Sequence, residues 1–217
     1  ETLDLSSSDD RVQLEHFFLA ASVNTFDIPL TGSQSLPLGF HSQLQHASVS
    51  SGDSLVMTIT LTESQRVAAL LTSGTQGGDG STVFFHVKSG GYVDVGQNNN
   101  TADLAINITE HADGIKPYIL SAHIDLDIGQ IVVEVSETLD LTPSINSLDL
   151  NQIMLGNGSN TTGDYVSLDG ALSVVQVDSV NITVNLNEAQ RVRAIQISAT
   201  PGGDSEPMGL DVNGHAF

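Results

Sequence analysis

Short runs in which apolar and polar residues alternate recur along the whole chain. Leu55–Leu61 and Val180–Leu186 both place aliphatic side chains at every second position, with Thr or Asn between several of them. A period of two is typical of a strand with one buried face. Further strand-length runs occupy residues 81–87, 102–109, 118–128, 130–135 and 172–177. About fourteen to sixteen short strands at this spacing are typical of antiparallel sandwiches or barrels.

One stretch of the chain occurs twice. Twelve of 22 positions are identical between Thr58–Asp79 and Thr183–Asp204, which lie 125 residues apart. At the same offset, Ile28 and Leu30 align with the apolar pair Ile153 and Leu155. These matches predict an internal duplication in which residues 22–92 correspond to residues 147–217. We therefore expect an all-β protein with two related antiparallel β-sandwich or jelly-roll-type barrels.

A polar stretch between the two copies predicts the domain boundary. Gly96–Leu104 (GQNNNTADL) is rich in Asn and Gly and has the composition of a connector. We therefore expect a first β-barrel domain at residues 1–100 and a second at residues 101–217.

The local structure of the repeated segment is ambiguous from sequence. Thr62–Gln65 and Asn187–Gln190 both fit a capping box, with which a helix would begin. In Arg191–Ser198 (RVRAIQIS), however, apolar residues alternate as they do in a strand. We favour two strands joined by a short acidic turn over a helix in both copies.

A glutamate and an arginine three residues later recur in both copies. These candidate site residues are Glu63, Arg66, Glu188 and Arg191. They could clamp a ligand or a neighbouring subunit, or they could form an ion pair that braces a turn, worth about 0–1 kcal/mol when exposed. No nucleophile accompanies them, and no catalytic motif occurs elsewhere, so the sequence predicts no enzyme.

Each copy ends with the same Gly-Gly-Asp sequence. Tandem glycines permit positive φ and an aspartate can cap its own turn, so this sequence predicts a repeated turn. Its residues are Gly77, Gly78, Asp79, Gly202, Gly203 and Asp204. A calcium site would need further oxygen ligands, for which the candidates are Asp94, Asp164 and Asp169. Neither a calcium-loop spacing nor a zinc-type histidine spacing occurs, so we expect no metal and no cofactor.

The charge of the chain adds a constraint on its surroundings. Asp and Glu total 26 against six Lys and Arg, which gives a net charge of −20. This much self-repulsion destabilises a compact state unless salt screens it, and the Debye length falls to about 3 Å at 1 M. The composition predicts adaptation to molar salt, and without a basic patch nucleic acid is not an expected partner. The absence of Cys excludes disulfides and thiolate chemistry.

The duplication of Thr62–Asp79 in Asn187–Asp204, the chain length and the acidity together resemble one protein family. It is the larger major capsid protein of icosahedral, internal-membrane viruses of halophilic archaea. The resemblance implies two stacked β-barrels without catalytic residues, in a symmetric oligomer with other capsid subunits, among them a smaller single-barrel protein. It also implies a place in the virion shell, above a viral membrane vesicle and in hypersaline surroundings.

A second hypothesis is a secreted or cell-surface carbohydrate-binding or adhesion module of a halophile. The stretches IVVEV, IMLGNG and LDGALSVVQV faintly resemble laminin-G-like domains. Sugar recognition uses exposed aromatic side chains, whereas this chain has three Tyr, seven Phe and no Trp. A third possibility, a β-rich hydrolase, lacks an identifiable pair of working groups.

Overall fold

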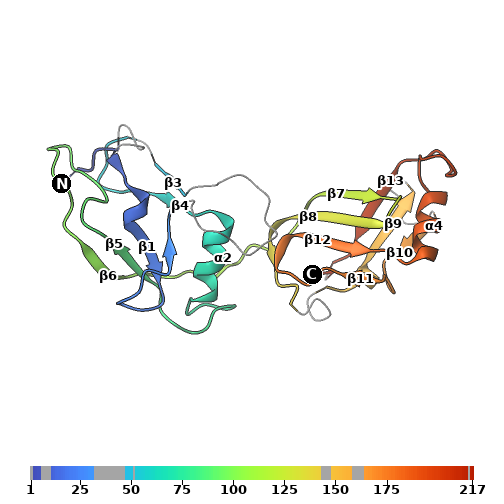
Figure 1. Cartoon of the computed structure of the whole chain (residues 1–217), viewed down its shortest axis with the longest axis horizontal. Helices are drawn as coiled ribbons and strands as arrows, with labels where there is room; N and C mark the ends of the chain where they lie inside the picture. Colours follow the sequence, from blue (N-terminus) through green and yellow to red (C-terminus); the bar gives the residue numbers. More distant parts are fainter. Residues whose placement is uncertain are drawn as a thin grey trace. The chain divides into compact units, whose positions relative to one another are not determined.

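The computed structural model divides into two compact units, unit 1 (Glu1–Gly114) and unit 2 (Ile115–Phe217) (Figure 1). The structure describes residues 2–5, 11–31, 47–50, 52–142, 148–157, 164–214 and 216–217. The chain is mostly β with several antiparallel sheets, which confirms the all-β class. No sheet formed by the described strands closes on itself.

Unit 1 has a four-stranded sheet of order β2-β1-β5-β6, a two-stranded sheet β3-β4 and one α-helix. All its pairings are antiparallel. Its elements are η1 (Leu14–His16), β1 (Phe17–Ala20), β2 (Ile28–Pro29), β3 (Ser48–Val49), β4 (Ile59–Thr60), α2 (Glu63–Leu71), β5 (Phe84–Val87) and β6 (Asp103–Asn107).

Unit 2 has a four-stranded sheet of order β11-β12-β8-β7 and a three-stranded sheet of order β10-β9-β13. Both sheets are antiparallel, and one α-helix follows β12. Its elements are β7 (Ile119–Asp125), β8 (Gln130–Leu139), η2 (Leu150–Gln152), β9 (Ile153–Asn157), β10 (Tyr165–Ser167), β11 (Ser173–Val174), β12 (Ser179–Asn185), α4 (Glu188–Gln196) and β13 (Met208–Val212).

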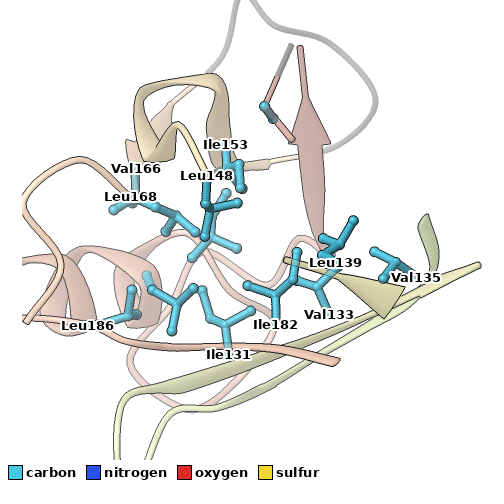
Figure 2. Close-up of a cluster of buried hydrophobic side chains, with 14 of the residues drawn as sticks. Ile131, Val133, Val135, Leu139, Leu148, Ile153, Val166, Leu168, Ile182 and Leu186 are labelled. Carbon is cyan, nitrogen blue, oxygen red and sulfur yellow. The ribbon is translucent and has the colours of Figure 1, made fainter. Parts of the chain in front are cut away.

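Each unit has its own hydrophobic core. In unit 2, Ile131 and Ile182 of the four-stranded sheet lie in one buried cluster with Leu155 and Val166 of the three-stranded sheet. Figure 2 shows this cluster, with side chains from β8 and β12 on one side and from the β9–β10 region on the other. The alternation of apolar residues along β8 thus supplies one inner face of a two-layer core. A separate cluster around Phe17 forms the core of unit 1.

The boundary between the units lies between Gly114 and Ile115, and not at residue 100. The polar stretch expected to be a connector is a turn held to unit 1 by its own side chains. Asn100 Nδ2 donates to the Lys88 carbonyl (3.1 Å), and Asn100 Oδ1 accepts from the Tyr92 amide (3.1 Å). The chain then continues into β6, which pairs with β5.

The expectation of two strands in the repeated segment is wrong, because both copies form a helix. α2 begins after Thr62 and α4 after Asn187, each with a complete capping box. In α4 the buried residues are Gln190 and Ala194, four positions apart, and the C-cap residue Ile197 is buried three positions later. Capping satisfies backbone donors that a strand would have to pair elsewhere. The stabilisation from capping outweighs the preference for a strand that the alternation in RVRAIQIS indicates.

Apart from β6 in unit 1 and β7–β8 in unit 2, the two units share a series of elements in the same order, at three different offsets. Thr2–Leu5, η1 and β1 correspond to Thr138–Leu141, η2 and β9, 136 residues later. β2 corresponds to β10 at an offset of 138. The offset of 125 applies only from β3 onward, where β3, β4, α2 and β5 correspond to β11, β12, α4 and β13.

Hydrogen bonds between distant segments establish this correspondence. The Leu30 amide donates to the Phe17 carbonyl and the Leu168 amide to the Ile153 carbonyl, both at 3.0 Å. Three more bonds recur in the same way. The Lys88 amide donates to the His16 carbonyl (2.8 Å), as the Asn213 amide does to that of Gln152 (2.9 Å). The Gln13 amide donates to the Gly91 carbonyl, as the Asp149 amide does to that of Ala216 (both 2.8 Å). The Ser50 amide donates to the Thr58 carbonyl (2.9 Å), as the Val175 amide does to that of Thr183 (3.0 Å).

The alignment of Ile28 and Leu30 with Ile153 and Leu155 is therefore wrong. Ile28 and Leu30 are the counterparts of Val166 and Leu168, and all four side chains are buried. The error arises because every strand of this kind alternates apolar residues, so neighbouring strands can be mistaken for each other. The displacement comes from the connection between β2 and β3, which is 18 residues long, whereas its counterpart between β10 and β11 has five.

Candidate functional site

The sequence-predicted site lies at the start of α2 in unit 1 and of α4 in unit 2. Thr62 Oγ1 accepts from the Gln65 amide (3.3 Å), and Gln65 Oε1 accepts from the Thr62 amide (2.9 Å). Asn187 and Gln190 make the same two bonds at 2.9 and 3.0 Å. This reciprocal capping fixes the first turn of each helix, and with it the side chains that follow.

Gln65 and Gln190 were not among the predicted site residues, although they are the buried polar residues on which the helix start depends. Gln65 Nε2 donates to the carbonyls of Pro29 (3.1 Å) and Thr31 (3.4 Å). Gln190 Nε2 donates to the counterpart carbonyls, at 2.9 and 2.8 Å, in the segment that contains β10. Both side chains thereby tie a helix to a strand, and their identity in the two copies is the signal that could have revealed them.

In both helices the repeated arginine donates two hydrogen bonds to the carboxylate of the repeated glutamate. Arg66 Nε and Nη2 donate to Glu63 at 2.7 and 2.8 Å. Arg191 makes the same fork with Glu188, at 2.9 Å for both bonds. A bidentate fork of this kind has a fixed geometry, which orients the remaining guanidinium nitrogen.

That remaining nitrogen reaches a different acceptor in each unit. Arg66 Nη1 donates to the Asp113 carboxylate at 2.7 Å. Arg191 Nη1 instead donates to the Leu126 carbonyl (3.0 Å) in the turn between β7 and β8. A Cβ added at Gly129 would lie 3.0 Å from Arg191 Cδ, so the aliphatic part of the arginine passes closely over this turn. In unit 2 the arginine therefore connects α4 to the β7–β8 hairpin.

The fork in unit 2 shifts the protonation of both partners. Hydrogen bonds from Arg191 hold the pKa of Glu188 below its usual range. The same hydrogen bonds, with the carboxylate charge added, raise the pKa of Arg191. Both shifts favour the charged forms, so the pair is ionised at neutral pH. A carboxylate stabilised in this way is a poor general base.

The Gly-Gly-Asp sequences follow the helices and form the same turn in both units. Gly77 and Gly202 have φ of +94° and +95°, a conformation that favours glycine. A Cβ on Gly203 would lie 2.0 Å from the Ser198 carbonyl oxygen, and one on Gly78 would lie 2.2 Å from that of Ser73. Neither second glycine can therefore be replaced without movement of the backbone.

The aspartates of these turns bond to their own loops. Asp79 Oδ1 accepts from the Ser81 amide (2.8 Å), and Asp204 Oδ1 accepts from the Glu206 amide (3.0 Å). Asp204 also accepts from Asn157 Nδ2 at 2.6 Å, which connects the turn to the end of β9. These carboxylates therefore act in turn formation.

The three aspartates considered as further calcium ligands bond to other groups. Asp94 accepts from Asn98 within a loop of unit 1, and Asp164 pairs with Arg193 at 2.8 Å. Asp169 offers its backbone carbonyl to Gln190. Among the residues that the structure describes, no three His, Cys, Asp or Glu side chains gather as a possible metal site.

The hydrogen bonds and ion pairs of the site hold neighbouring elements of each unit together. Its amides, carboxylates and guanidinium groups bond to the backbone or to each other, and the same set occurs in each unit. Within the described ranges, no helix has the length and apolar character that crossing a bilayer would require. Comparisons of the chain with protein-family models, curated proteins and solved structures find no match.

Proposed function

We propose that this chain is a structural building block that assembles with other copies of itself in concentrated salt and does not act as a catalyst. The observation that carries the proposal is the edge strand β11 of unit 2. Leu172, Val175 and Val177, which flank this strand, are 72%, 44% and 52% exposed. Exposed edge strands pair readily with other strands, and proteins that must stay monomeric usually protect them with lysine or proline.

No such protection is present on this edge. The two lysines of the chain are Lys88 and Lys116, and the segment 172–177 contains neither lysine nor proline. Antiparallel pairing of β11 with β11 of a second copy would join two four-stranded sheets about a twofold axis. The exposed aliphatic side chains would then be covered in the joined sheet. The occupant of this edge is thus another copy of the same chain.

The net charge sets the conditions in which such copies can meet. At a charge of −20, two subunits repel each other at low ionic strength. Molar salt reduces the range of this repulsion to about 3 Å, which permits contact between apolar edges. Salt therefore controls assembly, and the acidic surface keeps free subunits dispersed until it is screened.

Two kinds of assembly fit this proposal. One is the virion shell, with capsid subunits, a smaller single-barrel partner and a membrane vesicle beneath. It requires the finer fold of two jelly-roll-type barrels, for which the two facing sheets of unit 2 are the best support. The other is a cell-surface adhesion module or array of a halophile. It is favoured by the duplication of one unit in series, because arrays grow by adding units.

The assembly proposal is tested by placing a charge on the β11 edge. We expect the parent chain to form particles that grow between about 0.5 and 4 M salt, as measured by light scattering. Val175→Lys should shift the population to monomer, because a lysine in a joined edge would be desolvated without a partner. Ser50→Lys, at the corresponding position of unit 1, is the matched control and should leave the size unchanged.

A monodisperse monomer at every salt concentration would contradict the proposal. Electron microscopy of the particles then separates the two assemblies. Closed shells that take up a smaller β-rich protein support the virion hypothesis. Sheets or filaments, or binding to a glycan array, support the surface module.

A further inference from the structure

In unit 2, strand β12 is paired along both of its edges. β11 lies on one side, and β8 lies on the other with six matched residue pairs between Ser179 and Asn185. The hairpin that β8 forms with β7 places Ile131, Val133 and Val135 in the core, each no more than 2% exposed. Figure 2 shows these side chains beside Ile182 of β12.

In the part of the chain that the structure describes, the corresponding stretch of unit 1, Leu55–Leu61, has a strand partner on one side only. β4, which lies within it, pairs with β3, and the described strands place nothing along its other edge. Leu55 and Val56 of this stretch are 73% and 68% exposed. A strand with an open edge and exposed aliphatic side chains is a template for a further strand.

The inward-facing side chains of Leu55–Leu61 are also less buried than their counterparts in unit 2. Met57, Ile59 and Leu61 of unit 1 are only half-buried, although they pack against its core. Their counterparts Ile182, Val184 and Leu186 are 0%, 1% and 4% exposed. The additional cover in unit 2 comes from the aliphatic residues of the β7–β8 hairpin. Unit 1 thus has these core-facing side chains, but the layer of residues that would cover them is incomplete.

The path by which a hairpin would enter unit 1 is fixed by a second, exact repeat. Glu1–Leu5 and Glu137–Leu141 both read ETLDL. Leu3 pairs with Ser54 as Leu139 pairs with Ser179. In unit 2 this segment begins within β8, whose last three residues are Glu137–Leu139.

The anchoring of this segment also repeats. Leu5 donates its amide to Asp53 Oδ1 at 3.1 Å, and Leu141 donates to Asp178 Oδ1 at 2.9 Å. The ETLDL segment of unit 1 is therefore positioned as it would be at the end of a β8-type strand.

We propose that a β-hairpin of the β7–β8 type pairs with the open edge of Leu55–Leu61. The hairpin belongs to another repeat of this kind, and its second strand leads into Glu1 as β8 leads into the ETLDL segment of unit 2. Aliphatic residues at every second position of that strand cover Met57, Ile59 and Leu61 and complete the core of unit 1. This inference does not depend on which assembly the chain builds.

One more group of unit 1 is placed to receive the hairpin. The Leu186 amide donates to the Gly129 carbonyl in the β7–β8 turn at 2.8 Å, and Leu61 is its counterpart. A seated hairpin would bring its turn to Leu61. The hairpin of a second copy is a poorer source, because removing Ile131 and Val133 from their own core would cost as much as it gains.

The proposal is tested by grafting residues 115–136 directly ahead of Glu1 in the full chain. Because the ETLDL sequences are identical, this graft reproduces the junction of unit 2 without a designed linker. We expect amide exchange at Met57, Ile59 and Leu61 to slow by at least about tenfold, since these amides would enter a sheet. Exchange in β12 serves as the internal reference and should not change.

The matched control carries Ile131→Asp and Val133→Asp in the grafted copy only. It has the same length and the same junction but cannot enter an apolar core, so Leu55–Leu61 should exchange as in the parent. Equal or faster exchange of Leu55–Leu61 in the grafted chain, with β12 unchanged, overturns the proposal. So does a parent chain in which Leu55–Leu61 is already protected and light scattering reports a dimer, because a second copy then fills the edge.

Discussion

Gln190 joins three parts of unit 2 through one side chain. Its Oε1 caps the backbone at Asn187, and its Nε2 donates to the carbonyls of Ser167 and Asp169. The residue is only 8% exposed, so none of these partners has ready access to water if the amide is lost. A buried polar group left without a partner costs about 1–3 kcal/mol.

We therefore expect Gln190→Leu to lower the free energy of unfolding of unit 2 by about 3 kcal/mol. Hydrogen exchange of β12 in increasing urea reports this unit separately from unit 1. Gln196→Ala, at the exposed end of the same helix, is the control and should change stability by less than about 0.5 kcal/mol. Equal losses in the two variants would contradict the role assigned to Gln190.

The Glu188–Arg191 pair gives unit 2 a defined response to acid. The folded state lowers the pKa of Glu188, so its stabilising contribution is complete above the pKa of the unfolded chain, about 4.3. The contribution is lost as the pH falls through the lower, folded pKa. We expect Glu188→Gln to lower the melting temperature at pH 7 and the difference from the parent to vanish well below pH 4.

Thermal melts of the parent and of Glu188→Gln between about pH 7 and 3 measure this difference. Comparing the two proteins at each pH removes the effect of the other carboxylates, which titrate equally in both. A difference that persists at the acid end would contradict the assignment.

At the scale of elements, strand content was predictable and the repeated helix was not. The runs at residues 118–128 and 130–135 contain β7 and much of β8, and in β8 the period-two alternation directly records one buried face. The helices were not predicted because α4 buries Gln190 and Ala194, which does not follow the alternation of RVRAIQIS. A capping box and a Gln shared by both copies were the better evidence.

The candidate site was predictable in composition but not in its most important member. Charge drew attention to the Glu–Arg pairs, which do lie together. The neutral glutamines were overlooked because their partners are backbone carbonyls some 20 to 36 residues away, which sequence spacing does not show. The insertion between β2 and β3 likewise concealed the true correspondence of the N-terminal strands.

The turn after each helix gives an element-scale prediction. Gly203→Ala should destabilise unit 2 by about 2 kcal/mol or more, because the new Cβ would overlap two backbone carbonyl oxygens within 2.5 Å. Gly78→Ala should do the same to unit 1. Gly214→Ala has open space around its Cβ and is the control. Urea unfolding read by amide exchange in each unit measures all three, and a tolerated Gly203→Ala would contradict the shared turn geometry.

At the scale of the whole molecule, charge dominates. Twenty uncompensated negative charges act on both units at once, and their repulsion is relieved by salt at any position. Specific ion pairs such as Arg66–Asp113 weaken in salt, but few of them exist, since only six basic residues are available. The net effect of salt should therefore be stabilising.

We expect the melting temperature to rise by on the order of 10 °C between about 0.1 and 2 M NaCl, equivalent to about 2 kcal/mol. Circular dichroism at neutral pH measures the rise. At about pH 4, near the sequence pI of ≈ 4.2, the same salt range should have a much smaller effect. A melting temperature that falls with salt at neutral pH would contradict the dominance of self-repulsion.

The identical ETLDL segments also have a consequence for inheritance. They occupy the same structural position in both units, 136 residues apart. An unequal crossover between the DNA stretches that encode them would insert 136 codons in frame. The longer product would pass from β8 into an intact ETLDL segment, which is the junction that unit 2 already has. The gene can therefore lengthen by a whole unit at this position.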